Sequence, residues 1–464
     1  MLDLPRTDAR DAGTKDSCLF YQTGSALPTA ERGEGIYIWD TKGKKYLDAC
    51  SGSFAANLGH GDRRMLKAAE GQMEKISFAY RTQFENEPAN ELSRFLVSLS
   101  PDHLKRVFLV NSGSEAVEAC MKLARQYWWA RGQNSKAKFI SRRPSYHGAT
   151  LGALSLTSYH DLNAPFEPLT VKSPKVSAPF CYRCPLGKTY PSCKTACADE
   201  LEEVINEVGA ENIAAFVTEP IGGASTGGAV PPDEWFPMIE ATCRKHNILL
   251  IVDEVLTGCG RTGAFYGFEH WGIKPDLVAV AKGLSAGYAP VGACLAREEI
   301  VEVVVKNGGF MHGHTLAGNP LASAVALQAL KIVVEDRLVE NAKVTGQYLQ
   351  VKLRALKEKY AFIGDVRGKG LLAGIEFVSD KKTKEPFPKE WNVGGKATGL
   401  ARARGLLIYP RRSIFGISGD HVSLAPPLII DKTGVDEIIT LLEATLTELG
   451  QWLQMQGQKH AATG

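Results

Sequence analysis

The chain has 464 residues, of which 44% are hydrophobic, 23% charged and 8% aromatic, and its formal net charge is +3. These values are ordinary for a folded protein and exclude collagen-like repeats and a disordered chain. A nearly neutral balance gives no general attraction to nucleic acid or anionic membranes, so we expect small-molecule chemistry.

Apolar runs of the roughly 18–20 residues that a membrane span requires are absent from the sequence. The first residues mix both charge signs and lack the apolar stretch of a secretory signal. Ten cysteines are too few for a disulfide-stapled scaffold of this length. We therefore expect a cytoplasmic protein that is not embedded in a membrane.

The first predicted elements form a small antiparallel hairpin from residues 34–40 and 44–48, where apolar and polar residues alternate around a turn. Further along, the apolar residues 107–110 predict a strand. Val117, Cys120, Ala124 and Trp128 then recur at helical spacing, which predicts a helix beginning near Ser114.

Three more apolar runs lie at residues 214–217, 248–252 and 277–280, and each is too short for a helix. Continuous apolar runs of this length are typical of strands buried on both faces, as in a mostly parallel sheet. After them, Asn319 as N-cap and Pro320 in the first turn predict a long helix through Val334.

The predicted fold class is α/β, with a large domain around a mostly parallel sheet and a smaller α+β domain made from both ends of the chain. We predict that residues 1–60 begin the small domain, residues 61–320 form the large domain, and residues 321–464 complete the small domain.

Three charged residues come where these runs end: Glu219 after Thr218, Asp253 after Val252 and Lys282 after Ala281. Ligands bind outside the carboxyl ends of the strands in open parallel sheets, so these residues predict a site. A purely structural network of ion pairs is the alternative interpretation.

The sequence NSGSE at residues 111–115 lies where the first large-domain strand ends and its helix begins. Small residues at a helix N-terminus favour a phosphate, although the same sequence is also an ordinary N-cap. A phosphate anchor, a carboxylate and a lysine together are the groups that bind pyridoxal phosphate.

Several motifs extend this pattern over nearly the whole chain: FLVNSGSEAVEA at 108–119, YHG at 146–148, EP at 219–220, DEV at 253–255, AKG at 281–283 and HGHT at 312–315. In this order the motifs resemble those of the class III (omega) aminotransferases, which are pyridoxal-phosphate enzymes of fold type I.

The resemblance implies a Schiff-base and proton-transfer role for Lys282, and pairing of Asp253 with the pyridinium nitrogen. It places the cofactor phosphate on Gly113 and Ser114.

Tyr146 and Val255 would pack on the two faces of the ring, unless Tyr146 is a core tyrosine. His147 and Glu219 would lie just behind the cofactor, or else be structural. Thr315 would reach the phosphate of a neighbouring subunit, which implies a homodimer with shared sites, whether or not dimers pair into tetramers.

The substrate end is less defined by these motifs. Relatives that prefer 2-oxoglutarate commonly carry a glutamate at the position of Ala224, so we expect pyruvate as acceptor and an amine or omega-amino acid as donor. The adjacent Arg411 and Arg412 are candidates for binding a carboxylate, or else a solvated pair. Three aromatic residues are candidates for the substrate channel or for the small-domain core: Phe54, Tyr80 and Phe84.

Two further patterns suggest other chemistry. The sequence GCGRTG at 258–263 matches a dinucleotide fingerprint, but it does not directly follow a strand, so we interpret it as a loop. Four cysteines lie close together, which suits either a structural zinc site or thiols packed in an insertion; we predict no catalytic metal. They are Cys181, Cys184, Cys193 and Cys197.

The main hypothesis is thus a pyridoxal-phosphate-dependent transamination. An aminomutase or a decarboxylating transaminase on the same scaffold is the nearest alternative. A nicotinamide-dependent oxidoreductase or a non-catalytic protein is the alternative from another class.

Overall fold

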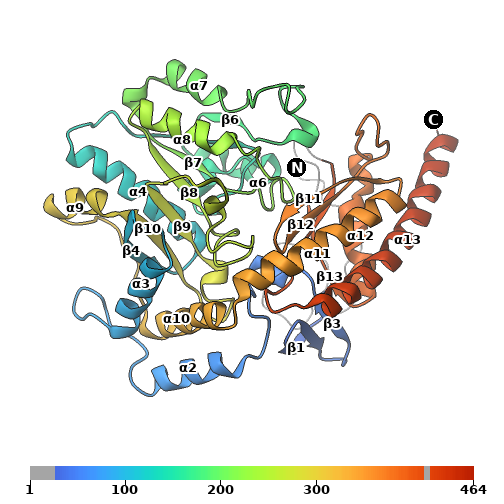
Figure 1. The fold of residues 1–464 in the computed structure, drawn as a ribbon, viewed down its shortest axis with the longest axis horizontal. Helices are drawn as coiled ribbons and strands as arrows, with labels where there is room; N and C mark the ends of the chain where they lie inside the picture. Colours follow the sequence, from blue (N-terminus) through green and yellow to red (C-terminus); the bar gives the residue numbers. More distant parts are fainter. Residues whose placement is uncertain (1–26, 412–418, 464) are drawn as a thin grey trace.

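The computed structural model describes residues 27–411 and 419–463 of the chain. A seven-stranded sheet forms its centre, in the order β4 (Leu104–Val110), β10 (Gly292–Arg297), β9 (Leu277–Val280), β8 (Leu249–Asp253), β7 (Ile213–Thr218), β5 (Lys138–Arg143) and β6 (Lys175–Ser177) (Figure 1). Strand β10 is antiparallel to both of its neighbours, and the other strands run in one direction. The predicted mostly parallel sheet is confirmed.

Helices cover both faces of this sheet, which explains why its strands are continuous apolar runs. Phe216 and Val252 pack on one face with α3 (Glu87–Ser98), α7 (Glu200–Val208), α8 (Trp235–Lys245) and α10 (Pro320–Glu335). Their neighbours Val217 and Ile251 pack on the other face with α4 (Gly113–Ala130), α5 (Leu151–Leu156) and α9 (Glu298–Lys306).

Two four-stranded sheets lie beside this layer. One has the order β1 (Ala30–Glu34), β2 (Tyr37–Asp40), β3 (Lys45–Asp48) and β13 (Leu406–Leu407), and the other the order β11 (Ile363–Lys369), β12 (Leu372–Phe377), β15 (His421–Leu424) and β14 (Tyr409–Arg411). The predicted hairpin is β2 and β3, paired antiparallel. Because β3 also pairs with β13, the two ends of the chain share a sheet. The exact domain boundaries at residues 60 and 320 stay predictions.

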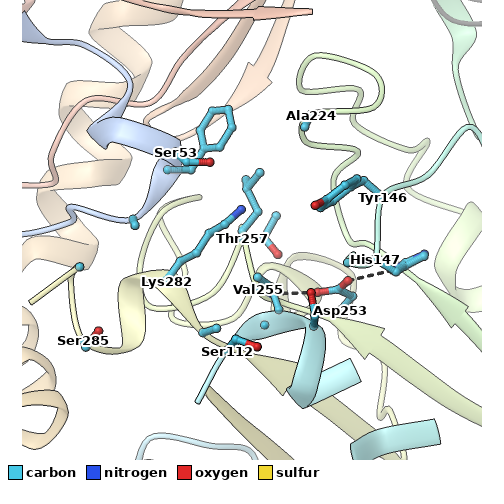
Figure 2. Close-up of a pocket in the computed structure, with 18 of the residues that line it drawn as sticks. Ser53, Ser112, Tyr146, His147, Ala224, Asp253, Val255, Thr257, Lys282 and Ser285 are labelled. Carbon is cyan, nitrogen blue, oxygen red and sulfur yellow. Dashed lines mark hydrogen bonds and ion pairs between the residues drawn. The ribbon is translucent and has the colours of Figure 1, made fainter. Parts of the chain in front are cut away.

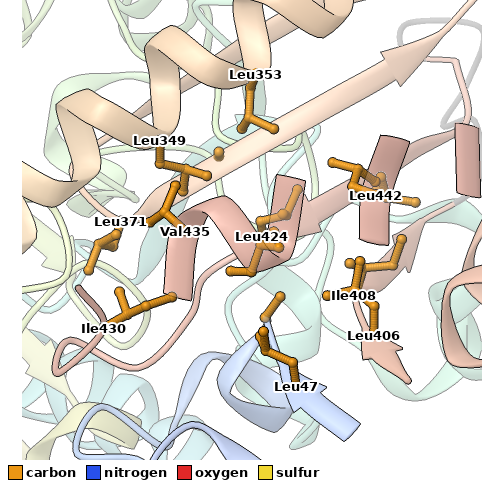
Figure 3. Packing of buried hydrophobic residues seen from close by; sticks show 14 of the residues in the cluster. Leu47, Leu349, Leu353, Leu371, Leu406, Ile408, Leu424, Ile430, Val435 and Leu442 are labelled. Atoms are coloured by element: carbon orange, nitrogen blue, oxygen red, sulfur yellow. The ribbon is translucent and has the colours of Figure 1, made fainter. Parts of the chain in front are cut away.

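A large apolar cluster joins these two sheets to α11 (Leu338–Lys359), α12 (Val393–Ala403) and α13 (Lys432–Thr463). Figure 3 shows Leu47 from the N-terminal hairpin beside Leu406 and Leu424 from the C-terminal third. Burying such side chains contributes roughly 1.5–3 kcal/mol each. Contacts between residues far apart in sequence therefore hold the smaller part together.

The long helix predicted after Asn319 is α10, and its N-cap is as expected. The Asn319 side chain accepts a hydrogen bond from the Ala322 amide at 3.0 Å, and Pro320 occupies the first turn. Helix α2 (Arg63–Met73) precedes α3 in the chain. The remaining helical elements are short: α1 (Ser51–Phe54), α6 (His160–Asn163), η1 (Ala164–Leu169), η2 (Cys181–Arg183), η3 (Ala210–Asn212), η4 (Gly267–Trp271), η5 (Lys282–Leu284) and η6 (Lys389–Trp391). Within the described ranges, no helix has the length and apolar character needed to cross a bilayer.

Candidate active site

A cavity of about 470 Å³ opens where strands β7, β8 and β9 end (Figure 2). Its volume suits a small-molecule ligand. The predicted residues that line it are Phe54, Gly113, Ser114, Tyr146, His147, Glu219, Asp253, Val255, Lys282 and Arg411. The structure therefore brings the three strand-end charges, the helix start and one candidate arginine to the same space.

Asp253 is the last residue of β8, and its carboxylate is buried. Oδ2 accepts a hydrogen bond from Nδ1 of His147 at 2.8 Å, and Oδ1 accepts one from the Val255 amide at 3.0 Å. These two bonds fix the orientation of the carboxylate. A buried carboxylate is stable when a cation or further donors compensate it, so this position suits a cationic ring nitrogen.

Lys282 follows β9 and begins the turn η5, where its φ of 49° lies in the left-handed region. A non-glycine residue held there stores strain, which is common at functional sites. Burial lowers the pKa of the Lys282 amine to about 8, although the nearby charge of Asp253 opposes this shift. The next residue is a glycine because a Cβ at Gly283 would lie 2.3 Å from Nδ2 of Asn57.

Helix α4 begins at the cavity. Ser112 is its N-cap, with Oγ accepting a hydrogen bond from the Glu115 amide at 3.2 Å. The amides of Gly113 and Ser114 have no partner within the helix, and the helix dipole makes this end positive. A Cβ at Gly113 would lie 2.7 Å from Val255 Cγ1, so glycine allows the helix start to approach Val255. The result is an anion-binding position on one side of the cavity.

Glu219 follows β7 and is buried at the cavity floor. Its Oε2 pairs with Nη2 of Arg142 at 3.1 Å, and Arg142 lies on the neighbouring strand β5. Arg142 was not among the residues predicted from the sequence. The sequence shows Arg142 only as a charged residue near the end of a strand. Such residues are too common to mark a site.

The outer end of the cavity is built from other parts of the chain. The rings of Phe54 and Tyr409 lie 4.8 Å apart, and the Lys282 amine lies 5.4 Å from the Phe54 ring. Arg411 donates a hydrogen bond from Nη2 to the Tyr409 hydroxyl at 3.0 Å. Its Nε is buried and has no hydrogen-bond partner among the described residues. Ala224 packs against Phe54 and Ile221, so this wall is apolar and compact.

Other predicted site residues lie elsewhere. Thr315, Tyr80 and Phe84 are exposed and do not line the cavity of the single chain. Their two segments run side by side, because Arg81 donates to the His312 carbonyl and Asn319 donates to the Ser77 carbonyl. Arg412 lies outside the described residues.

The four clustered cysteines, Cys181, Cys184, Cys193 and Cys197, line a second cavity of about 20 Å³. All of them are free thiols. Within the described ranges, however, no group of three or more His, Cys, Asp or Glu side chains is placed to hold a metal ion. Packed thiols and a structural zinc site both stay predictions for this cluster.

The glycine-rich stretch 258–263 is a loop, and the next helical element is the short turn η4, which begins at Gly267. Its Arg261 is fully buried and donates to Asn57 Oδ1 at 2.7 Å and to the Leu371 carbonyl at 3.2 Å. The loop thus connects the large sheet to both ends of the chain, as expected for a structural element rather than a dinucleotide site.

The chain matches the family Aminotransferase class-III over residues 21–446. The aminotransferase YodT of Bacillus subtilis (strain 168) is 41% identical over 92% of this chain and 96% of its own length. The putrescine–pyruvate aminotransferase of Pseudomonas aeruginosa is 37% identical over 90% of each chain. An amine transaminase from an uncultivated Pseudomonas species, solved in its PLP-bound form, superposes with a TM-score of 0.89 at 33% identity, covering 94% of this chain and all of the other.

The chain belongs to the class-III aminotransferases. Its fold is that of the fold-type I pyridoxal-phosphate-dependent transferases, and it is an enzyme of the transaminase class. The resemblance drawn from the motifs is confirmed.

Class-III aminotransferases depend on pyridoxal phosphate, and the donor set of the cavity fits that cofactor. A helix N-terminus faces the cavity at Gly113 and Ser114, a fixed carboxylate lies at Asp253, and a buried amine lies at Lys282. These groups match a phosphate, a pyridinium nitrogen and an aldehyde, respectively.

Proposed function

We propose that this aminotransferase moves an amino group from an amine or omega-amino acid to a keto acid, with pyruvate as acceptor and alanine as product. The single observation that carries this proposal is the cavity in which the amine of Lys282, the carboxylate of Asp253 and the amide end of α4 meet. Such a combination serves pyridoxal-phosphate chemistry.

Lys282 is proposed as the residue that attaches the cofactor and transfers the proton. A lysine acts as a base in its neutral form, and burial already lowers the pKa of this amine to about 8. When bound, pyridoxal phosphate supplies an aldehyde that takes up the amino group and a ring that withdraws the electron pair. Lys282 Nζ would be the group that takes up and returns the proton.

Asp253 is proposed to bind the ring nitrogen and keep it protonated, with His147 orienting the carboxylate. Gly113 and Ser114 would bind the phosphate through their backbone amides. Val255 and the half-buried Tyr146 line the cavity and would contact the two faces of the ring. Glu219 would lie just behind the cofactor, at the floor of the cavity.

Arg411 is proposed to bind the carboxylate of the keto acid. Its guanidinium borders the cavity, lies 4.9 Å from the Tyr409 ring and leaves Nε without a partner among the described side chains. A half-buried guanidinium with an unpartnered Nε is suited to binding a carboxylate. Phe54 and Ala224 would contact the remainder of the substrate.

The compact wall at Ala224 supports a short acceptor, since this position carries no side chain that could regulate access to Arg411. A similar relative from Pseudomonas aeruginosa is named for the use of pyruvate. Both points favour pyruvate over 2-oxoglutarate.

We further propose a homodimer. Exposed large apolar residues gather on the segments around residues 76–84 and 311–316, which run side by side: Ile76, Phe78, Tyr80, Phe84, Met311 and Leu316. An apolar face of this kind is typical of a protein interface. It carries the exposed Thr315, which would then contact the cofactor phosphate of the partner subunit. The free thiols agree with a reducing compartment, so we place the dimer in the cytoplasm.

Acceptor preference can be tested by single-turnover measurements. The cofactor-loaded enzyme is first charged with an amine and then mixed with pyruvate or 2-oxoglutarate while the absorbance is followed. We expect faster discharge with pyruvate. Faster discharge with 2-oxoglutarate would contradict the acceptor assignment, and carbon dioxide release or isomerisation without an acceptor would support the alternative reactions.

A further inference from the structure

The ion pair between Arg142 and Glu219 lies directly beneath the cavity. Strands β5 and β7 are parallel neighbours, with Ile140 paired to Phe216, so both residues reach the same edge of the sheet. Glu219 lines the cavity, whereas Arg142 does not, and only 2% of its surface is exposed. Arg142 therefore touches the cavity lining through its ion pair with Glu219, and its charge also interacts with Asp253 at longer range.

The surroundings of Glu219 make its charge depend on Arg142. Burial raises the pKa of the Glu219 carboxyl, and the positive charge of Arg142 is the largest opposing influence. The other groups that face this carboxyl are His147, the carboxylate of Asp253, which raises its pKa further, and Lys282. Removing one partner of a buried ion pair leaves an uncompensated charge, so a carboxyl without Arg142 would take up a proton.

Arg142 itself is held in a way that suits a fixed charge. Its guanidinium carbon lies 5.6 Å from the Trp235 ring, and a guanidinium keeps its proton at neutral pH. The geometry thus gives Glu219 a permanent cation at 3.1 Å on the side away from the cavity. The charge of Asp253 and then that of Glu219 favour a cationic nitrogen at Lys282, whereas Arg411 and Arg261 oppose it.

We propose that Arg142 is a positioning residue that keeps Glu219 ionised at the cavity floor and thereby sets the pH at which the cofactor-linked nitrogen of Lys282 loses its proton. This inference rests on the proposed function, because it concerns the cofactor attached at Lys282. It assigns no contact between Arg142 and the cofactor.

The test is an absorbance titration of the cofactor-loaded enzyme, together with its cofactor dissociation constant from equilibrium dialysis. We expect Arg142→Met to lower the midpoint of the titration by on the order of one pH unit, because a neutral Glu219 no longer favours the cationic nitrogen. Glu219→Gln should lower it by the same amount. The double variant Arg142→Met/Glu219→Gln should match Glu219→Gln alone, since Arg142 acts through Glu219.

An unchanged midpoint in Arg142→Met would overturn the proposal, and so would a double variant whose shift is the sum of the two single shifts. If Arg142→Met does not fold, the comparison of Glu219→Gln with the double variant decides, because the double variant buries no unpaired charge: equal midpoints support the proposal and different midpoints overturn it. A wild-type protein that shows no cofactor absorbance at all would instead contradict the proposed function.

Discussion

At the inner end of the cavity each polar group follows a strand of one sheet or begins α4, whereas the outer end joins Phe54, Ala224 and Tyr409 from three separate parts of the chain. The inner groups are held by hydrogen bonds of 2.8–3.1 Å between buried atoms, as at Asp253 and Glu219. The outer end is mostly apolar, and its arginine keeps one buried nitrogen without a partner in the described part of the chain.

This difference indicates that the two ends of the cavity have different roles in the reaction. The inner end is preorganised, so its charges can stabilise developing charge without rearrangement during the reaction. The outer end contacts the variable part of the substrate and can differ between relatives without disturbing the sheet. Changes at the inner end should therefore reduce the rate with every substrate, and changes at the outer end should act on particular substrates.

The largest expected effect is that of Lys282→Ala. Without this amine the proposed enzyme has no attachment point and no proton carrier, so we expect turnover to be abolished while the protein stays folded. Borohydride reduction followed by peptide mass spectrometry checks the attachment. Lys175 is a matched internal control, because desolvation also lowers the pKa of its amine, to about 7, but it lies outside the cavity. Label on Lys175, or normal turnover in Lys282→Ala, would contradict the assignment.

Asp253→Asn should have the next largest effect. It keeps the shape of the side chain but removes the charge proposed to hold the ring nitrogen protonated. We expect a loss of roughly 10²–10³-fold in kcat, equal to about 3–4 kcal/mol, by analogy with removal of one preorganised electrostatic partner.

Asp276→Asn is its control, since Asp276 is a buried aspartate just before β9, at the opposite edge of the same sheet. It accepts a hydrogen bond from the Leu250 amide at 2.7 Å and pairs with Arg244 and Arg297. Removing the charge of Asp276 should lower the thermal stability of the protein and leave the rate per folded enzyme nearly unchanged. Equal losses of rate in both variants would mean that Asp253 has only a structural role.

The lowered pKa of Lys282 predicts a specific pH dependence in the cofactor-free protein. Since the amine has a pKa of about 8, against about 10.4 for an exposed lysine, half of it is neutral near pH 8. Its rate of reaction with an amine-specific acylating reagent should rise with pH and level off above about 8. At pH 8 its neutral fraction should exceed that of an ordinary lysine by about 100-fold.

The same shift has a consequence for stability. Between about pH 8 and 10.4 the unfolded chain binds more protons at this lysine than the folded chain, so the contribution of Lys282 to the free energy of unfolding rises with pH in that window. For the acylation experiment, peptide mapping at several pH values measures the rate at which the reagent modifies Lys282. If the midpoint of this pH dependence lies near 10.4, the Lys282 amine is exposed to solvent and does not belong to the buried inner end of the cavity.

Most of the inner end could be predicted from the sequence because each residue directly follows a local signal. An apolar run must end in a loop, so Glu219, Asp253 and Lys282 were predictable as strand-end residues, and the small residues at 112–114 marked a helix start. Arg142 was not predictable, because its partner lies 77 positions away and the pair depends on which strands are neighbours.

The outer end was predicted only in part, for the same physical reason. Phe54 reaches the cavity through α1, where its φ of 62° sets the chain direction, and no local pattern requires that conformation. Tyr409 faces Phe54 only because β14 joins a sheet with β15. The proposed contact of Thr315 with a cofactor phosphate would need a second subunit, which no single chain contains.

Arg411→Met should have a smaller effect than Lys282→Ala or Asp253→Asn and should act on one substrate. It removes the guanidinium proposed to bind the carboxylate of the keto acid and keeps an apolar side chain of similar length. Hydrogen bonds to charged groups contribute about 1.5–3 kcal/mol, so we expect the KM for pyruvate to rise roughly 10–100-fold. The half-reaction with an amine lacking a carboxylate should proceed at nearly the wild-type rate.

Tyr409→Phe is the matched control for this variant, because it removes only the hydroxyl that accepts the hydrogen bond from Arg411 Nη2. If that bond positions the guanidinium, the KM for pyruvate should rise a few-fold, in line with the loss of about 0.5–1.5 kcal/mol for one hydrogen bond. Stopped-flow measurement of the two half-reactions separates the substrates. An Arg411→Met enzyme that loses the same factor with the amine as with pyruvate would place Arg411 with the inner end, and the proposed division between the two ends of the cavity would then be wrong.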